Sequence, residues 1–323
     1  MKRSFHGLGL EVRDQGLMSM FSLLARLDEH EGNTALTLRL HASPSVADVE
    51  ASSREVARFT HGSIRGLIRS GGFCVFDGRS KIEVSANSLD FWVDPASLAD
   101  GYTFRSTTSF IAFTLALRLR GWFHHHAGLL ISTGGSPVLL LGEGGAGKTT
   151  TTLACLEAGF EYGSDDATFV TRDLSLLGTP SLFHVSERTA IAFPRLAPWL
   201  GPRYRENNDK RELDPRSAFP GQERRSTSAP RVILMPSIHA EPTELVPWSQ
   251  AETFGALVTA SAFVILDGMP LVSEQLDVER RLASSAVGAE LRLGPDALAD
   301  LSIIPRLIRE VEVEARLRAL RAP

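Results

Sequence analysis

The stretch Val138–Thr150, which reads VLLLGEGGAGKTT, decides the fold of this chain of 323 residues. An apolar run enters it, a glycine-rich turn follows, and helix-compatible residues continue through Thr149–Glu157 until Gly159, a residue type that often ends a helix. Strand, loop and helix in this order are the context that the pattern GxxxxGK[ST] requires. The stretch therefore predicts a phosphate-binding loop, or P-loop, in an α/β domain.

Each fixed position of this motif has a mechanical task. The glycines let the backbone wrap an anion, so that several N–H groups and the positive end of the helix dipole face the phosphates. We expect Lys148 to hold phosphate oxygens and the Thr149 hydroxyl to ligate Mg²⁺, with ATP as the nucleotide. The residues expected to bind the nucleotide are Gly142, Gly144, Gly145, Ala146, Gly147, Lys148, Thr149 and Thr150.

Two adjacent acids, Asp165 and Asp166, follow a short apolar stretch and should emerge at the end of a strand. Alone, such a pair is as often a turn former or a helix cap. Beside a P-loop, one carboxylate can hold Mg²⁺ and another can accept the proton of an attacking hydroxyl. We therefore expect Asp165 and Asp166 to be metal ligands and catalytic residues, together with Lys148, provided that the backbone bends there.

Three histidines, His124, His125 and His126, come directly before an apolar run at residues 127–131. Consecutive residues cannot easily face one metal ion, so His124 and His125 are interpreted as packed or exposed side chains without a catalytic role. His126 adjoins the strand expected to pair with the P-loop strand. Its imidazole is a candidate to reach bound phosphate.

The pattern of the remaining chain predicts two domains. Residues 34–93 alternate in the manner of strands, and 73–76 and 81–84 flank the turn residues Asp77 and Gly78, which indicates a hairpin. A helix is expected at 109–120, ending at Gly121. We place a smaller β-rich N-terminal domain at 1–105, for substrate or partner binding, and the P-loop domain at 106–323.

Within the second domain, the runs at 127–131 and 138–141 are joined by a turn too short for a crossover helix, so they should pair antiparallel. Further strands are expected at 160–162, 168–171, 232–235 and 290–293, and helices at 250–264 and 305–320. Residues 201–231 show no sustained apolar period and predict a long loop with mobile parts. This loop is either a solvated surface or a lid that brings one cation, Lys210 or Arg211, onto the transferring phosphate.

Composition limits the classes of partner. A formal charge of −4 and a pI near 6.2 provide no general attraction for nucleic acid or an anionic membrane, so neither partner is expected. The two cysteines, Cys74 and Cys155, form no metal-binding or redox spacing, which favours reduced thiols. The N-terminus carries no apolar stretch typical of a signal sequence. A cytoplasmic location is the expectation.

The ordered set His126–Leu130, Leu140–Thr149 and Gly159–Asp166 resembles the kinase domain of the HPr kinase/phosphorylase family and its broader related branch. Looser similarity extends to Glu290–Pro295, which looks like that family's terminal strand and turn. The resemblance implies a P-loop on a mixed sheet, as in phosphoenolpyruvate carboxykinase. It also implies serine phosphorylation, with Asp165 and Asp166 dividing metal and base duties and His126 as an active-site histidine. Whether the subunits form a homo-oligomer, as in the true HPr enzymes, is left open by the sequence.

The long glycine-containing signature that the true HPr enzymes carry after the acid pair is absent from this sequence. This absence puts HPr in doubt as the substrate, together with the phosphorylase activity. The expected acceptor is a serine of a peptide or small protein, and a peptide like those modified by the related kinases of ribosomal peptide precursors is as plausible as HPr. Two alternatives remain open: a nucleotide-dependent switch without a phosphorylated product, and a small-molecule kinase. The latter is disfavoured because no second anion-binding cluster is evident outside the 201–231 loop.

Overall fold

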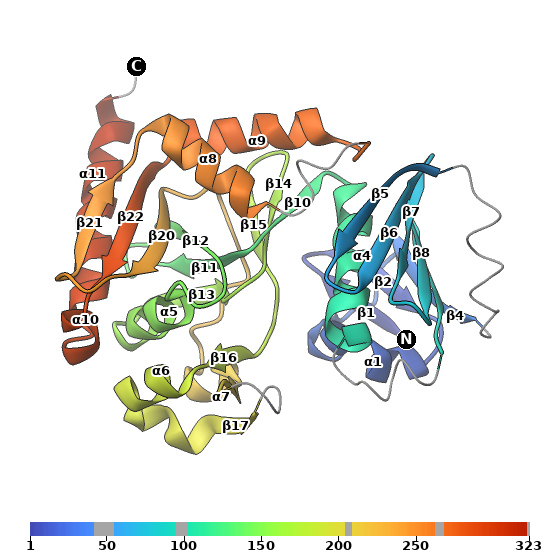
Figure 1. Cartoon of the computed structure of the whole chain (residues 1–323), viewed down its shortest axis with the longest axis horizontal. Coiled ribbons are helices and arrows are strands. Elements are labelled where there is room, and N and C mark those ends of the chain that lie inside the picture. Colours follow the sequence, from blue (N-terminus) through green and yellow to red (C-terminus); the bar gives the residue numbers. More distant parts are fainter. Residues whose placement is uncertain (42–54, 95–102, 204–208, 262–267, 322–323) are drawn as a thin grey trace. The chain divides into compact units, whose positions relative to one another are not determined.

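A computed structural model describes residues 1–41, 55–94, 103–203, 209–261 and 268–321. The chain forms two compact units, one comprising Met1–Phe123 with Phe263–Gln275 and the other His124–Ala262 with Leu276–Pro323. The predicted domain boundary, at 105/106, lies before the change of unit at 123/124. Both units combine helices with sheets, so the protein is a mixed α/β protein (Figure 1).

The first unit is built on one nine-stranded sheet with the order β3-β1-β2-β4-β9-β8-β7-β6-β5. Its strands are β1 (Lys2–Phe5), β2 (Leu8–Val12), β3 (Asp28–Glu29), β4 (Leu36–His41), β5 (Glu55–His61), β6 (Ile64–Arg69), β7 (Gly72–Phe76), β8 (Lys81–Ser85) and β9 (Ser88–Trp92). The predicted hairpin is confirmed, since β7 and β8 pair antiparallel. Leu36 and Leu38 are fully buried, as their alternation predicted.

Helices complete this unit. They are α1 (Gly16–Met20), the 3₁₀ turn η1 (Ser22–Arg26), the π-helical turn η2 (Thr103–Thr108) and α4 (Ser109–Arg118). The predicted helix at 109–120 is confirmed as α4, which packs against β7, β8 and β9. Nearly every side chain of α4 is buried, and its Arg118 donates from Nε to the carbonyl of Pro270 at 2.8 Å.

The second unit contains a six-stranded mixed sheet with the order β13-β11-β12-β20-β22-β21. The strands are β11 (Ala127–Ile131), β12 (Pro137–Leu141), β13 (Glu161–Ser164), β20 (Val232–Ile238), β21 (Glu244–Pro247) and β22 (Val287–Leu293). The antiparallel pairing expected for β11 and β12 is confirmed, whereas β12 with β20 and β20 with β22 are parallel. Strand β12 carries the P-loop at its C-terminal end.

Helices cover both faces of this sheet (Figure 1). Alternate residues of β12, β20 and β22, such as Val138, Val232 and Ala289, share one apolar core with α5 (Lys148–Glu157) and α11 (Ile303–Arg321). Helix α8 (Gln250–Ala260) lies on the other face, where Gly288 leaves room for Thr253: a Cβ at Gly288 would lie 2.0 Å from the Thr253 hydroxyl. The P-loop helix is therefore held in the main core of the unit.

Two smaller sheets belong to the remaining elements. One has the order β10-β14-β15-β19, formed by β10 (Trp122–His125), β14 (Thr168–Thr171), β15 (Leu176–Gly178) and β19 (Ser226–Thr227). The other has the order β16-β18-β17, formed by β16 (Phe183–Val185), β17 (Leu200–Arg203) and β18 (Arg211–Leu213), with α6 (Glu187–Ala192), the 3₁₀ turn η3 (Pro194–Trp199) and α7 (Pro215–Ala218).

The prediction of one long loop at 201–231 is wrong for part of that segment, because the short elements β18, α7 and β19 lie within it. Residues 204–208, including Arg205, lie outside the described residues. The helices that sequence patterns did not predict are, within the described residues, α1, α6, α7, α9 (Val272–Ser285) and α10 (Asp296–Ala299). Helix α8 begins as predicted, but 262–264 of the predicted range also lie outside the described residues.

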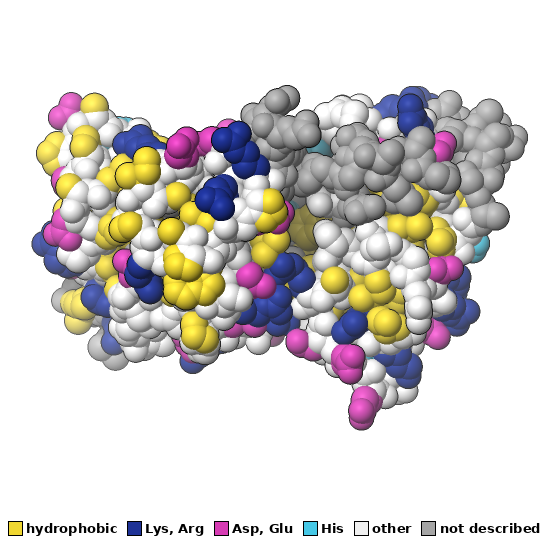
Figure 2. Space-filling view, turned by 90° about the horizontal axis from the view of Figure 1, so that it is seen from below, with side chains coloured by type: hydrophobic (Ala, Val, Ile, Leu, Met, Phe, Trp, Pro, Cys, Tyr) yellow, Lys and Arg dark blue, Asp and Glu magenta, His cyan; other side chains and the backbone are white. Residues whose placement is uncertain are grey.

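The distribution of surface charge and the state of the two cysteines are consistent with the composition of the chain. On the face shown in Figure 2, Lys and Arg side chains are interspersed with Asp and Glu. Cys74 and Cys155 are both free and buried, and burial raises the pKa of each thiol, that of Cys74 to about 12. None of the helices in the described ranges is both long enough and apolar enough to cross a bilayer.

Candidate functional site

The glycine-rich segment forms a tight turn between β12 and α5, as the motif predicts. Gly142, Gly145 and Gly147 have φ values of +130°, +92° and +107°, a region that side chains with a Cβ rarely adopt. Gly147 is the N-cap of α5 in left-handed conformation. At Gly147 a Cβ would also lie 2.6 Å from Cδ1 of Leu293 on β22. The turn thus needs glycine for both its backbone and its packing.

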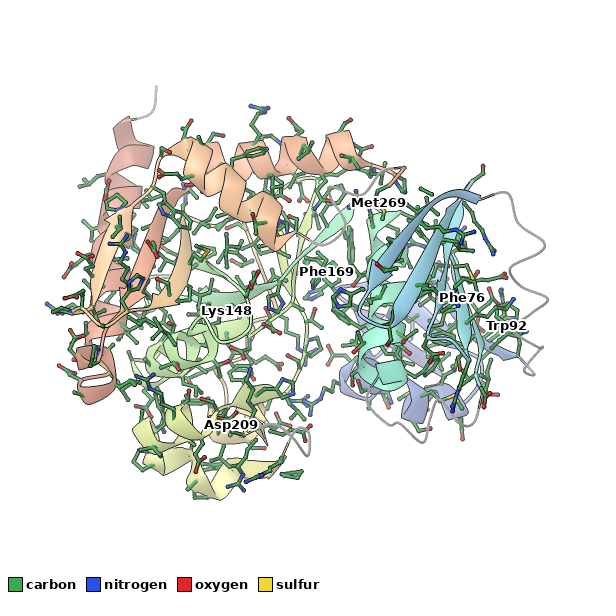
Figure 3. The ribbon with its side chains drawn as sticks, viewed as in Figure 1. Phe76, Trp92, Lys148, Phe169, Asp209 and Met269 are labelled. Atoms are coloured by element: carbon green, nitrogen blue, oxygen red, sulfur yellow. The ribbon has the colours of Figure 1, made fainter. Side chains whose placement is uncertain are left out.

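Lys148 opens α5 and lies with its ammonium group against the loop that precedes it (Figure 3). Nζ donates to the carbonyls of Gly142 at 2.6 Å and Glu143 at 3.2 Å, and lies 3.0 Å from Oδ1 of Asp166. The residue is only 5% exposed. A buried ammonium beside a helix N-terminus gives the turn a strong attraction for anions.

The two acids lie beyond the end of β13, where the chain bends after Ser164. Strand β11 approaches this bend closely: a Cβ on Gly128 would lie 3.0 Å from the Asp165 carbonyl. The register between β11 and β13 also shifts at Leu129 and Leu130. This bend supplies the condition that two adjacent acids require to serve one site.

Asp165 turns toward the start of α5 and Asp166 toward Lys148. The Thr149 hydroxyl donates to Oδ2 of Asp165 at 2.8 Å, and Asp165 is 5% exposed. Among the described residues, Oδ1 of Asp165 has no hydrogen-bond partner although it is buried. The side chain of Asp166 is 55% exposed and faces the pocket.

Burial and charge separate the pKa values of these two acids. Burial, with the neighbouring negative charge of Asp166, raises the pKa of Asp165 to about 6. Burial acts in the same direction on Asp166, but Lys148 and His126 outweigh it and lower its pKa. At neutral pH Asp166 is therefore ionised and paired with Lys148. Asp165 is buried beside the negative charge of Asp166, and both effects disfavour its ionised form.

The three histidines occupy three different environments. His124 is packed edge-on against Phe169, and burial lowers its pKa to about 3. His125 is fully buried, with Nε2 at 2.9 Å from both carboxylate oxygens of Glu279 on α9. His126 alone reaches the P-loop, with Nε2 at 3.0 Å from Lys148 Nζ and 3.2 Å from Asp166 Oδ1. Burial lowers the pKa of His126, so its ring is neutral at pH 7.

A pocket with about 970 Å³ of empty space, counted to its open mouth, collects most of these groups. The predicted residues that line it are Gly144, Gly145, Gly147, Lys148, Thr149, Thr150, Asp165 and Asp166. Gly142 and Ala146 shape the turn without lining the pocket, and His126 meets it through Lys148 and Asp166.

Sequence patterns missed two further groups of lining residues. One is apolar and comes from β22 and the segment after it: Leu293, Ala297, Leu298 and Ile304. The other is polar and basic and comes from β16 and from α6 with its N-cap: His184, Ser186, Arg188 and Thr189. Lys210, one of the two candidate cations named from the sequence, also lines the pocket. Arg211 does not reach the pocket, because its guanidinium donates to the carbonyls of Leu200 and Gly201 within the small sheet.

Comparison with known proteins adds little. No protein family model matches the chain, and no curated protein matches it. Among solved structures, it is similar to the Hpr(Ser) kinase/phosphatase from Coxiella burnetii, at 12% identity and a TM-score of 0.36, over 61% of this chain and 95% of that chain. A similarity at this level is distant and says nothing about the reaction.

Proposed function

We propose that the protein is an ATP- and Mg²⁺-dependent phosphotransferase. The observation that supports this most is the meeting of Lys148, Thr149, Asp165 and Asp166 at one pocket, where a buried ammonium, a hydroxyl and two carboxylates face a glycine turn. These groups are the ones that transfer of a γ-phosphoryl group requires, namely charge neutralisation, metal oxygen ligands and a proton acceptor.

Thr149 and Asp165 fit a magnesium ion. Mg²⁺ takes oxygen ligands and is usually held by one or two protein groups, with water and phosphate completing its shell. The Thr149 hydroxyl and Asp165 carboxylate adjoin each other, and the unpartnered buried Oδ1 of Asp165 lacks the interaction that an ion would provide. Within the described ranges, no set of three or more His, Cys, Asp or Glu side chains forms a dedicated metal cage.

The residues then divide the work of the reaction. When bound, Mg²⁺ supplies charge neutralisation at the phosphate oxygens. The amides of the turn and Lys148 bind the triphosphate, and Asp166, the more exposed acid, faces the acceptor and receives its hydroxyl proton. The acceptor oxygen bonds to the γ-phosphorus while the bond from that phosphorus to the bridging oxygen breaks, and ADP leaves with its electron pair.

The two ends of the pocket suggest how the nucleotide lies. The acids and Lys148 must adjoin the γ-phosphate, and the apolar side chains of Leu293, Ala297 and Leu298 adjoin the other side of the turn, beyond Gly147. An apolar wall suits the faces of a nucleobase. We infer that the nucleobase is held there.

The acceptor is the least constrained part of the proposal. The resemblance noted in the sequence suggests a serine in a peptide or small protein. The nine-stranded sheet of the first unit ends, within the described residues, at β3 and β5, and an extended peptide can add to such an edge. A nucleotide-dependent switch remains the competing function.

Labelled phosphate transfer tests the proposal. We expect label from γ-labelled ATP to appear on an acceptor when the protein is incubated with candidate peptides, metabolites or lysate, only with Mg²⁺ present. Lys148→Ala and Asp166→Ala should abolish the transfer while circular dichroism shows intact folds. Transfer that survives both substitutions would remove the assignment, and nucleotide-dependent partner binding without any labelled product would favour the switch.

A further inference from the structure

The pocket contains a second group of basic side chains, separate from the P-loop lysine. His184 lies on β16, Arg188 on α6 and Lys210 directly before β18, and all three line the same pocket as Lys148 and Asp166. The pairing of Val185 with Arg211 brings Lys210 beside the start of α6. Residues from β16, from α6 and from the position before β18 therefore line one wall of the pocket.

This basic wall is held in place against the P-loop helix. The Thr150 hydroxyl of α5 lies 3.0 Å from the Thr189 hydroxyl of α6, and Ser186, the N-cap of α6, lies 2.9 Å from that same hydroxyl. Its electrostatic influence reaches the reacting groups: His184 contributes to lowering the pKa of Asp166, and Lys210 contributes to lowering that of His126. The wall therefore lies close enough to act on the charges of Asp166 and His126.

The triphosphate does not need this wall. Lys148, the turn amides and the start of α5 can together surround one anion without it. Arg188 takes part in no hydrogen bond or ion pair among the described residues, so its guanidinium can bind a ligand. An acceptor hydroxyl placed at Asp166 would leave the rest of the acceptor molecule against His184, Arg188 and Lys210.

We propose that these three side chains bind an anionic group of the acceptor, so that the substrate is a hydroxyl compound carrying a phosphate or carboxylate. The proposal rests on the phosphotransferase function above and restricts its substrate class. A guanidinium and an ammonium recognise either anion through charge-assisted hydrogen bonds. They also offset the repulsion between an anionic acceptor and the triphosphate, which otherwise opposes their close approach.

Binding of inorganic phosphate to protein already saturated with Mg²⁺ and a non-hydrolysable ATP analogue tests this directly by calorimetry. We expect one phosphate site, weakened about tenfold or more by Arg188→Gln or Lys210→Gln, the loss expected for a charge-assisted contact. Affinity for the analogue should change less than about threefold. Arg203→Gln is the matched control, since Arg203 is exposed on β17 and does not line the pocket; it should leave both affinities unchanged.

Two results would overturn the proposal. One is phosphate binding unaffected by Arg188→Gln and Lys210→Gln; the other is an equal loss of analogue affinity in these variants, which would assign the wall to the nucleotide itself. Nucleotide-free Lys148→Ala protein keeps the test independent of the proposed function. Phosphate binding there that still depends on Arg188 supports the wall even if ATP never binds.

Acceptor pairs then identify the source of the anion. Each pair contains the same hydroxyl compound with and without a neighbouring phosphate or carboxylate, one set being small molecules and the other serine peptides. We expect kcat/KM to fall about tenfold or more when the anion is removed, and Arg188→Gln to erase that difference. Equal rates within every pair would contradict the inference.

Discussion

Lys148 and Asp166 form an ion pair at 3.0 Å in which the lysine is 5% exposed and the side chain of the acid 55%. The ammonium that should hold phosphate oxygens is thus already engaged by a carboxylate. An incoming triphosphate must take the place of Asp166 as the main partner of Lys148, and Asp166 is then released toward the acceptor. Nucleotide binding to Lys148 is thereby coupled to the release of Asp166, the proposed proton acceptor.

Substitution at the two ends of this pair should separate binding from transfer. Asp166→Asn removes the competing charge, so we expect ATP affinity to be unchanged or up to about tenfold tighter, while the transfer rate falls about 100-fold or more, the size of a general-base contribution. Lys148→Met should weaken ATP binding by about 100-fold, because it removes a buried charge partner. Calorimetry and single-turnover transfer measure the two effects. A comparable loss of ATP affinity in both variants would contradict the competition between Asp166 and ATP for Lys148.

Asp165 should make the ligand-free protein less stable as the pH rises. Its pKa of about 6 exceeds the ordinary value, so the folded state binds the proton more tightly than the unfolded state does. The corresponding stability is present below about pH 4 and is lost as pH rises through 6. The difference between 3.8 and about 6 corresponds to about 3 kcal/mol at most.

Asp165→Asn removes this pH dependence and is expected to stabilise the protein above pH 7 in the absence of divalent metal. Urea unfolding between pH 4 and 8 measures the difference between the two proteins, and Glu310→Gln, which changes an exposed carboxylate of α11, is the control. Mg²⁺ with nucleotide should stabilise the native protein and fail to stabilise Asp165→Asn to the same extent. If the two unfolding curves shift in parallel with pH, Asp165 does not titrate as described.

The glycine turn offers a prediction about backbone and packing together. Gly147→Ala combines a φ of +107° with a Cβ that would lie 2.6 Å from Leu293, so we expect a loss of about 2 to 4 kcal/mol of stability and of nucleotide binding. Leu293→Ala in the same chain should recover the packing part but not the backbone part.

Gly144→Ala is the matched control within the same turn. Gly144 has no positive φ and nothing within 4 Å of an added Cβ, so its replacement should cost less than about 0.5 kcal/mol. Thermal unfolding of the three variants measures the stability losses, and calorimetry with nucleotide measures the loss of binding. Equal losses of stability at Gly144 and Gly147 would contradict the positive φ and the close approach to Leu293 described for Gly147.

Local sequence patterns were sufficient for the centre of the site. The P-loop and its flanking strand and helix form one contiguous stretch, so its residues cannot lie far apart, and the bend after Ser164 brings Asp165 and Asp166 to that stretch. His126 was predictable for a similar reason, because β11 pairs with the P-loop strand. These contacts depend on short loops and neighbouring strands.

The basic wall was not predictable in the same way. Strands β16 and β18 are three residues long, too short for alternation to be recognised, and their pairing crosses more than twenty residues of chain. Helix α9 was missed because polar residues, Gln275 and Glu279, occupy fully buried positions where an amphipathic pattern requires apolar ones. In both cases the element is held by contacts between residues far apart in the sequence, and its local hydrophobic pattern is too short or too interrupted to predict it.

Glu279 should position the histidine segment rather than take part in the chemistry. Its carboxylate is fully buried and lies 2.9 Å from Nε2 of His125. It also accepts a hydrogen bond from the Ser261 hydroxyl at 2.6 Å. The backbone N–H of His126 donates to Ala260 at 2.8 Å in the same region. Removal of Glu279 therefore releases the chain on which His126 lies, next to Lys148 and Asp166.

We expect Glu279→Ala to lose about 3 to 5 kcal/mol of stability, the cost of leaving a buried partner unpaired, and Glu279→Gln to lose less. Asp277→Asn on the same helix is the control, since its ion pairs with Arg280 and Arg281 are exposed to solvent and should contribute little to stability. In folded Glu279→Gln, the transfer rate should fall with little change in ATP affinity, because His126 shifts relative to Asp166. A variant with reduced stability but a native transfer rate would show that the network supports only the fold.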